Sequence, residues 1–141
     1  MQIINATQVR KSWSEVVDSV VRERPAFIKR TRDCMMLSEI GLIEKMLELY
    51  TFNAELLTED DGSITISLDE IDLVENGIDE YDAIKKLAFS IFDYAQDYYS
   101  DFNYWYSAPN RKTHLPYVMK ALILNDTDKI GGIIKCRHGE I

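Results

Sequence analysis

The fold is decided by residues 1–50, which read MQIINATQVRKSWSEVVDSVVRERPAFIKRTRDCMMLSEIGLIEKMLELY. The order of apolar and polar residues predicts, in turn, a strand, an amphipathic helix, a basic hairpin and a second helix. Pro25 ends the first helix at Arg22 or Glu23, because the residue before a proline is disfavoured in helical geometry. The expected hairpin strands cover residues 26–31 and 34–37. Arg32-Asp33 is the expected turn, and Ser38 the expected N-cap of the second helix through Tyr50.

Two sequence signals support the first helix. Asn5 is a suitable N-cap, and Gln8 three residues later completes a capping-box pattern. The apolar residues then recur at steps of three and four, which predicts one stripe facing a core. The stripe consists of Val9, Trp13, Val16, Val17, Val20 and Val21.

Cations interrupt this apolar pattern at positions that a DNA duplex could reach. They lie off the stripe near the start of the helix, where the first turn has no acid, and in the hairpin. Lys and Arg neutralise phosphates, and Arg also reads guanine in the major groove. The same cations could instead protect an edge hairpin against aggregation. The predicted DNA-binding residues are Thr7, Arg10, Lys11, Lys29, Arg30 and Arg32.

The chain has 141 residues, enough for one ordinary domain or two very small ones. Its net charge of −8 is uneven, since residues 1–50 carry +1, residues 51–101 carry −12 and residues 102–141 carry +3. This asymmetry is typical of a DNA-contacting end joined to an acidic partner-binding end, and it also fits a solvated acidic face. Two cysteines indicate reduced thiols, and the chain shows neither a signal pattern nor a membrane-length apolar run. We therefore expect a cytoplasmic protein that does not enter a membrane.

The composition shifts around Phe52, and the rest of the chain again mixes strands and helices. Strands are expected at 54–57, 63–68 and 73–75, with turns at 59–62 and at Asn76-Gly77. The sequence thus predicts an α+β protein in two units, residues 1–50 and residues 52–141.

Helices are expected on both sides of the loop at residues 107–112. Asp79 is a good N-cap for a helix from Glu80 to about Tyr99, and its acidic first turn suits the helix dipole. A further helix is expected from Leu115 to Leu124, with Pro116 in its first turn. The tail from residue 130 fits either a short helix or a strand.

Other chemistry is less well supported. Four residues are of types that can bind zinc. However, Cys136 and His138 are closer in sequence than the usual spacing of zinc-finger ligands, and Cys34 lies in an apolar strand, where we expect it in the core. No Cys or Ser is paired with a His in a recognisable nucleophile pattern, so we expect no enzyme, catalytic residue, metal or cofactor. The zinc candidates are Cys34, His114, Cys136 and His138.

An aromatic cluster follows in residues 94–106. It could stack bases, but Asp93, Asp97 and Asp101 interleave it and would repel phosphate, so core packing or a protein interface is favoured. The acidic stretch 59–82 could mimic nucleic acid toward a basic partner or serve only as a soluble surface.

Residues 2–50 resemble the Phd/YefM family of antitoxins. The resemblance rests on the stretches Ile3-Ile-Asn-Ala-Thr-Gln-Val-Arg10, Pro25-Ala-Phe-Ile-Lys-Arg-Thr-Arg-Asp33 and Cys34-Met-Met-Leu-Ser38. It implies a homodimer, or a dimer of dimers, formed through the N-terminal module. It also implies binding to palindromic operator DNA, repression of the protein's own operon and neutralisation of a toxin by the C-terminal part. The usual Gly-rich hairpin turn is replaced here by Thr31-Arg-Asp-Cys34.

The second part departs from that family, whose members usually end in a short flexible tail. Residues 54–100 loosely resemble the HicB-like antitoxin domain, which implies a compact unit still within toxin–antitoxin biology. We therefore expect an antitoxin-type repressor with a basic toxin as partner. The alternatives are a repressor whose second unit binds a small ligand or another protein, and a protein-interaction module without DNA binding.

Overall fold

The computed structural model describes residues 1–139 and contains two compact units, Met1–Met46 and a second that begins at Leu47. Each unit has its own sheet and its own buried core, so the predicted α+β class is confirmed. Unit 1 consists of β1 (Ile3–Asn5), α1 (Ala6–Lys11), α2 (Trp13–Arg22), β2 (Ala26–Arg30), β3 (Asp33–Leu37) and α3 (Ile40–Met46).

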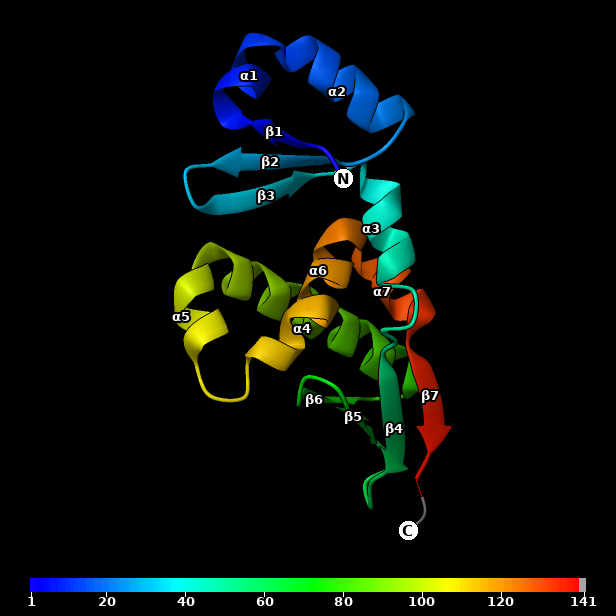
Figure 1. The fold of residues 1–141 in the computed structure, drawn as a ribbon. Coiled ribbons are helices and arrows are strands. Elements are labelled where there is room, and N and C mark those ends of the chain that lie inside the picture. The colour runs from blue at the N-terminus through cyan, green and yellow to red at the C-terminus, as the bar shows by residue number, and fades with distance from the viewer. Residues whose placement is uncertain (140–141) are drawn as a thin grey trace. The chain divides into compact units, whose positions relative to one another are not determined.

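The sheet of unit 1 has the order β1-β2-β3, with β1 parallel to β2 and β3 antiparallel to it. Helices α1 and α2 lie together on one side of these strands (Figure 1). Their contact with the sheet forms a small core of four buried residues, because the valines of both helices meet the central strand. The four are Val9, Val16, Val20 and Ile28.

The first helix is interrupted, which the sequence did not predict. Ser12 separates α1 from α2 with φ −116° and ψ 35°, outside helical geometry. Its hydroxyl accepts a hydrogen bond from Gln8 Nε2 at 2.9 Å, so Gln8 does not reach back to complete a capping box. Asn5 does cap α1, since its side chain accepts the Thr7 N–H at 2.8 Å.

Three residues of the predicted stripe are not in the core. Val17 is half-buried but does not join the cluster. Trp13 and Val21 are 54% and 61% exposed. The strands beneath the helices are only three to five residues long, so the sheet covers the narrow row of Val16 and Val20 and leaves the flanks uncovered.

The hairpin turn lies one residue earlier than predicted. Arg30 pairs with Asp33, so Thr31 and Arg32 form the connection, and Thr31 has the left-handed φ of 55°. A left-handed residue allows a two-residue connection to follow the twist of the strands. Cys34, predicted as core, is exposed because it lies on the sheet face opposite α1 and α2.

Helix α3 differs from the prediction at both ends. It begins at Ile40, where the Glu39 carboxylate accepts the Gly41 N–H at 2.9 Å, while the Ser38 hydroxyl donates to the Glu39 carbonyl instead. It ends at Met46 rather than at Tyr50, and it buries none of its residues.

Unit 2 is a sheet with helices on one face. Its sheet has the order β6-β5-β4-β7, and β7 is parallel to β4 while the other pairs are antiparallel. Helix α4 packs on β5 and β6, and α6 and α7 pack on α4 (Figure 1). The elements are β4 (Asn53–Thr58), β5 (Ile64–Leu68), β6 (Val74–Gly77), α4 (Glu80–Ser100), α5 (Phe102–Ser107), η1 (Lys112–His114), α6 (Leu115–Leu124), α7 (Thr127–Ile133) and β7 (Lys135–His138).

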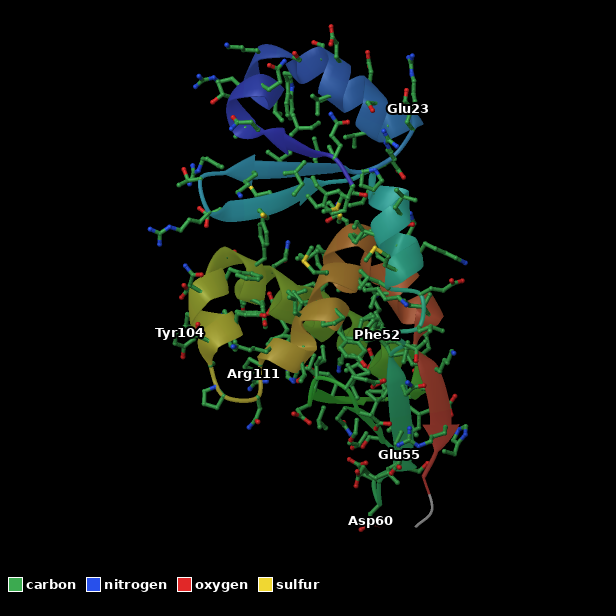
Figure 2. The ribbon with its side chains drawn as sticks, viewed as in Figure 1. Glu23, Phe52, Glu55, Asp60, Tyr104 and Arg111 are labelled. Atoms are coloured by element: carbon green, nitrogen blue, oxygen red, sulfur yellow. The ribbon has the colours of Figure 1, made fainter. Side chains whose placement is uncertain are left out.

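The core of unit 2 is the larger of the two. Phe52 points into it from the start of β4 (Figure 2). The alternate residues of β4 and β5 face α4, which explains why both strands have one buried side. Its largest fully buried side chains are Phe52, Ile66, Ile71, Leu87, Ile91, Tyr98, Val118 and Ile130.

Two helices of unit 2, α4 and α6, follow the sequence closely, whereas a separate α5 and the start of α7 at Thr127 were not predicted. The Asp79 side chain accepts the Asp82 N–H at 2.8 Å and starts α4, and α6 has the predicted bounds with Pro116 in its first turn. Asn76 and Gly77 form the end of β6 rather than a turn. The tail, for which a short helix or a strand was expected, contains both, since α7 is followed by β7. Among the described residues, no helix has the length and apolar character required to cross a bilayer.

Candidate nucleic-acid interface

The strand register of unit 1 brings the start of α1 next to the hairpin tip. Asn5, the last residue of β1, pairs with Lys29, and the two strands are parallel. The chain therefore leaves β1 into α1 at the end of the sheet where β2 turns into β3. Figure 1 shows α1 and this turn at the same end of unit 1. Segments more than twenty residues apart in the sequence thus lie at the same end of unit 1.

The three α1 residues of the predicted site share one side of that helix. Thr7 precedes Arg10 by three residues and Lys11 by four, which places the three side chains next to one another on a helical surface. All three are exposed, whereas Val9 between them is buried against the sheet. The interruption at Ser12 puts Arg10 and Lys11 in the last turn of α1, where cations also suit the helix dipole.

The hairpin supplies the other three residues. Lys29 lies on the sheet face opposite α1 and α2, next to Asn5 and Cys34 in the strand register, and Arg32 lies in the turn. Arg30 Nη2 is 3.8 Å from Asp33 Oδ2, with both side chains 73% exposed. An exposed pair at this distance stabilises little, so Arg30 remains available to a phosphate.

The structure thus brings all six predicted residues to exposed positions at one end of unit 1. Asp33 is the one acidic residue in α1 and in the hairpin tip, residues 30–33. Five cations and one hydroxyl on a helix and a neighbouring hairpin can contact successive phosphates and a base edge.

The zinc candidates are not assembled. Cys34 belongs to unit 1, and the other three belong to unit 2. Within residues 1–139, no group of three His, Cys, Asp or Glu side chains is arranged to hold a metal ion. His138 pairs with Glu80, and His114 is buried in a different contact.

That contact is a polar cluster inside unit 2, which the sequence did not reveal. His114 Nδ1 lies 2.7 Å from the Tyr94 hydroxyl and 3.4 Å from Arg111 Nη1. A guanidinium can only donate, so Nδ1 is the acceptor. Burial, reinforced by the Arg111 charge, lowers the pKa of His114. The Arg111 guanidinium also lies over the rings of Tyr94 and Trp105, at 5.8 Å and 5.9 Å from their centroids.

The predicted aromatic cluster is thus divided between core and surface. Tyr98 is fully buried and donates its hydroxyl to the Arg111 carbonyl at 2.8 Å. Tyr99 and Tyr104 are exposed, and Figure 2 shows Tyr104 at the outer side of α5. Tyr94 packs edge-to-face against Tyr98 and Trp105, and Tyr98 stacks on Trp105, so these rings pack on one another rather than forming an open platform for bases.

Two comparisons with known proteins find similarity to antitoxins along nearly the whole chain. A family model described as PHD_like, antitoxin of toxin–antitoxin, RelE/RelB, TA system, matches residues 1–136. The crystal structure of an antitoxin part of a candidate toxin/antitoxin system from Syntrophomonas wolfei subsp. wolfei is similar with a TM-score of 0.92 and 42% sequence identity. This similarity covers 99% of the present chain and 100% of that one. A comparison with curated proteins finds no match.

Proposed function

The chain belongs to the PHD_like family of antitoxins of RelE/RelB toxin–antitoxin systems, and from this premise we propose that unit 1 binds operator DNA as a homodimer. In this role the protein represses its own operon in the cytoplasm, as the Phd/YefM resemblance implies. The observation that carries the proposal is the Asn5–Lys29 register, because it brings Thr7, Arg10 and Lys11 to the same end of unit 1 as the hairpin cations.

The DNA contacts divide into two kinds. Lys11 and Lys29 are point charges suited to phosphates. Each phosphate contact releases a counterion from the DNA, so binding becomes weaker at higher salt. Arg10, Arg30 and Arg32 can also donate bidentately to guanine in the major groove. Thr7 contributes a hydroxyl beside Arg10. In this assignment the lysines set affinity and the arginines set sequence preference.

The exposed sheet face of unit 1 supports the homodimer. Ile3, Phe27 and Met36 form one row across the three strands on the face opposite α1 and α2. All three are exposed, and a contiguous apolar row on a sheet face is typical of a protein contact. A second copy on this face would relate two DNA-contacting ends by a two-fold axis, which matches a palindromic operator.

An antitoxin has a toxin as its partner, and we assign its neutralisation to unit 2. The −12 charge of residues 51–101, all of which belong to this unit, suits a basic toxin. Unit 2 has a buried core of its own, so this role does not require a disordered tail to fold over the toxin. The HicB-like resemblance of residues 54–100 stays a prediction.

The test is binding to DNA from immediately upstream of the protein's own gene, compared with a scrambled duplex, by fluorescence anisotropy across a salt series. We expect a clear preference for the upstream DNA and a steep fall of affinity with salt. Equal and weak binding to both duplexes would contradict the repressor and favour an interaction module without DNA binding.

A further inference from the structure

A groove lies between two helices of unit 2, and we call it the α4–α7 groove. Residues 81–85 of α4 form one wall, and residues 127–132 of α7 form the other. The helices approach each other most closely at Gly131, where a Cβ would be 3.6 Å from Ala88 Cβ and 3.7 Å from Ile84 Cγ2. A Cβ on Gly132 would meet no heavy atom within 4 Å, so the space beside Gly132 is open.

The size of the groove indicates what can fill it. Its volume is about 260 Å³, and its lining is mostly apolar. Sites for cofactors and other small molecules usually measure roughly 300–1,000 Å³ and enclose most of their ligand. A groove of this size suits one or two apolar side chains that a partner protein inserts.

Tyr81 stands at the rim of the groove and has no role in the core. It is 76% exposed, and it is not among the residues that pack against the core of unit 2. Tyrosine is frequent among the side chains that contribute most to protein binding, because it combines a large apolar ring with a hydroxyl. An exposed tyrosine beside an apolar groove therefore favours a protein partner.

The walls also carry charges that a partner can complement. Lys85 lies on the α4 wall and Asp128 on the α7 wall, and within residues 1–139 neither forms an ion pair. The other carboxylates at the starts of α4 and α7 are engaged in helix caps or in pairs with Lys86 and His138, so Asp128 is the one that is open to a cation from outside. These engaged carboxylates are Asp79, Glu80, Asp82 and Asp126.

The secondary structure of the walls favours a helix as the occupant. An added strand needs the unpaired backbone of a sheet edge, and no strand lines the groove. Two helices with a cleft between them accept the apolar stripe of a third helix. The missing side chains of Gly131 and Gly132 allow that helix to come close to α7.

We propose that the α4–α7 groove is where the toxin docks, through an amphipathic helix that inserts one or two large apolar side chains and places an arginine or lysine against Asp128. This inference rests on the proposed assignment of toxin neutralisation to unit 2. Charge complementarity supports this occupant, because the −12 charge of residues 51–101 attracts a basic protein and Asp128 offers its cation an unpaired carboxylate. The toxin thus binds a preformed surface, and no segment of this chain has to fold around it.

Filling the groove is the first test. Surface plasmon resonance measures binding of the full-length chain to the second protein encoded in its operon, which serves as the toxin probe. Gly132→Trp occupies the open space, so we expect binding at least about tenfold weaker, whereas Gly132→Ala should bind like the wild type. Gln96→Trp is the matched control, since Gln96 is exposed on the same helix more than ten residues beyond Lys85.

Two further variants test the rim without adding bulk. Tyr81→Ala should weaken binding at least about tenfold, and Tyr99→Ala, at an exposed position near the end of α4, should not. Asp128→Lys should speed dissociation by at least about tenfold, because it opposes the cation of the docked helix. Asp60→Lys at the β4–β5 turn (Figure 2) makes the same charge change elsewhere and should leave the dissociation rate unchanged.

The outcomes separate this site from the proposed function. If the wild type binds the second protein of the operon and both Gly132→Trp and Tyr81→Ala bind it equally well, the groove is not the docking site, while neutralisation by unit 2 stands. If the wild type does not bind that protein, the toxin assignment fails and the groove proposal fails with it. Circular dichroism verifies that each variant is folded, and Tyr81→Ala keeps the test decisive if Gly132→Trp disturbs α7.

Discussion

Gly77 at the end of β6 lies directly against Ala83 in the first turn of α4. A Cβ on Gly77 would be 2.3 Å from the Ala83 nitrogen and 2.7 Å from its Cα, closer than any carbon can approach without displacement. The φ angle of Gly77 is not in the left-handed region, so the glycine is required for space rather than for conformation. The strand and the helix touch through their backbones here, and this contact fixes the position at which α4 starts.

Replacing Gly77 by alanine should lower the free energy of unfolding by about 1–3 kcal/mol, because β6 or the first turn of α4 must move. Urea unfolding followed by circular dichroism measures the change. Gly132→Ala is the control, since a Cβ there meets no heavy atom within 4 Å and a helical alanine replaces a glycine. Its stability should be unchanged or higher by up to about 1 kcal/mol. Equal effects of the two changes would contradict the close approach.

Removing one of the guanidiniums that we propose to contact DNA should weaken operator binding while leaving the fold intact. For Arg10→Ala and Arg30→Ala we expect losses of roughly 1–3 kcal/mol if the contact reads a base, with a salt slope lower by about one for each lost phosphate contact. Fluorescence anisotropy at several salt concentrations gives both quantities. Arg22→Ala at the end of α2 is the matched control, because Arg22 is exposed but lies at the other end of the helical layer. Persistent tight binding by both variants would refute the assigned surface.

The proposed unit 1 dimer should depend on the sheet face opposite the helices. Phe27→Glu places a carboxylate in the middle of the row formed with Ile3 and Met36, and burying it against a second copy is unfavourable. Light scattering coupled to gel filtration should show a smaller assembly, and operator affinity should fall as well. Val21→Glu, an exposed apolar residue of α2, serves for comparison and should leave the mass unchanged.

Stability should depend on pH through His114. Burial and the Arg111 charge lower the pKa of His114 in the folded unit, so the unfolded chain takes up this proton at a higher pH. The contribution of neutral His114 to the free energy of unfolding is therefore fully present above about pH 6.5, the usual pKa of histidine. It is lost as the pH falls from there toward the lowered pKa of the folded unit. Urea unfolding at pH 7.5 and pH 5.5 measures the loss. His114→Gln should reduce the difference between the two pH values, whereas His138→Gln on the exposed β7 should retain it.

Local signals predicted helices α4 and α6 of unit 2. Asp79 caps α4, and α6 runs over the predicted Leu115–Leu124, because a capping side chain and a first-turn proline act within a few residues of the helix end. The break at Ser12 escaped prediction, since apolar residues on both sides of it keep helical spacing. A pattern of that kind reports which face is apolar and not whether the backbone is continuous.

Long-range pairing decided what the sequence left open. The tail fits helix or strand locally, and its strand β7 forms because β4 provides a parallel neighbour. The candidate DNA-binding residues were found from charge and spacing alone. Their position at one end of unit 1 depends on the β1–β2 register, which no local pattern contains.

The pairing of β7 with β4 has a consequence for the order in which the protein matures on the ribosome. Glu55 faces Arg137 across the two strands, 82 positions later in the chain. Unit 1 has all its strands once residue 37 has been synthesised, so the portion assigned to DNA can fold early in translation. One edge of β4 remains open until β7 has emerged, and open strand edges attract other strands. A nascent antitoxin therefore passes through a period in which its first unit is folded while the second is unfinished and prone to wrong strand pairing.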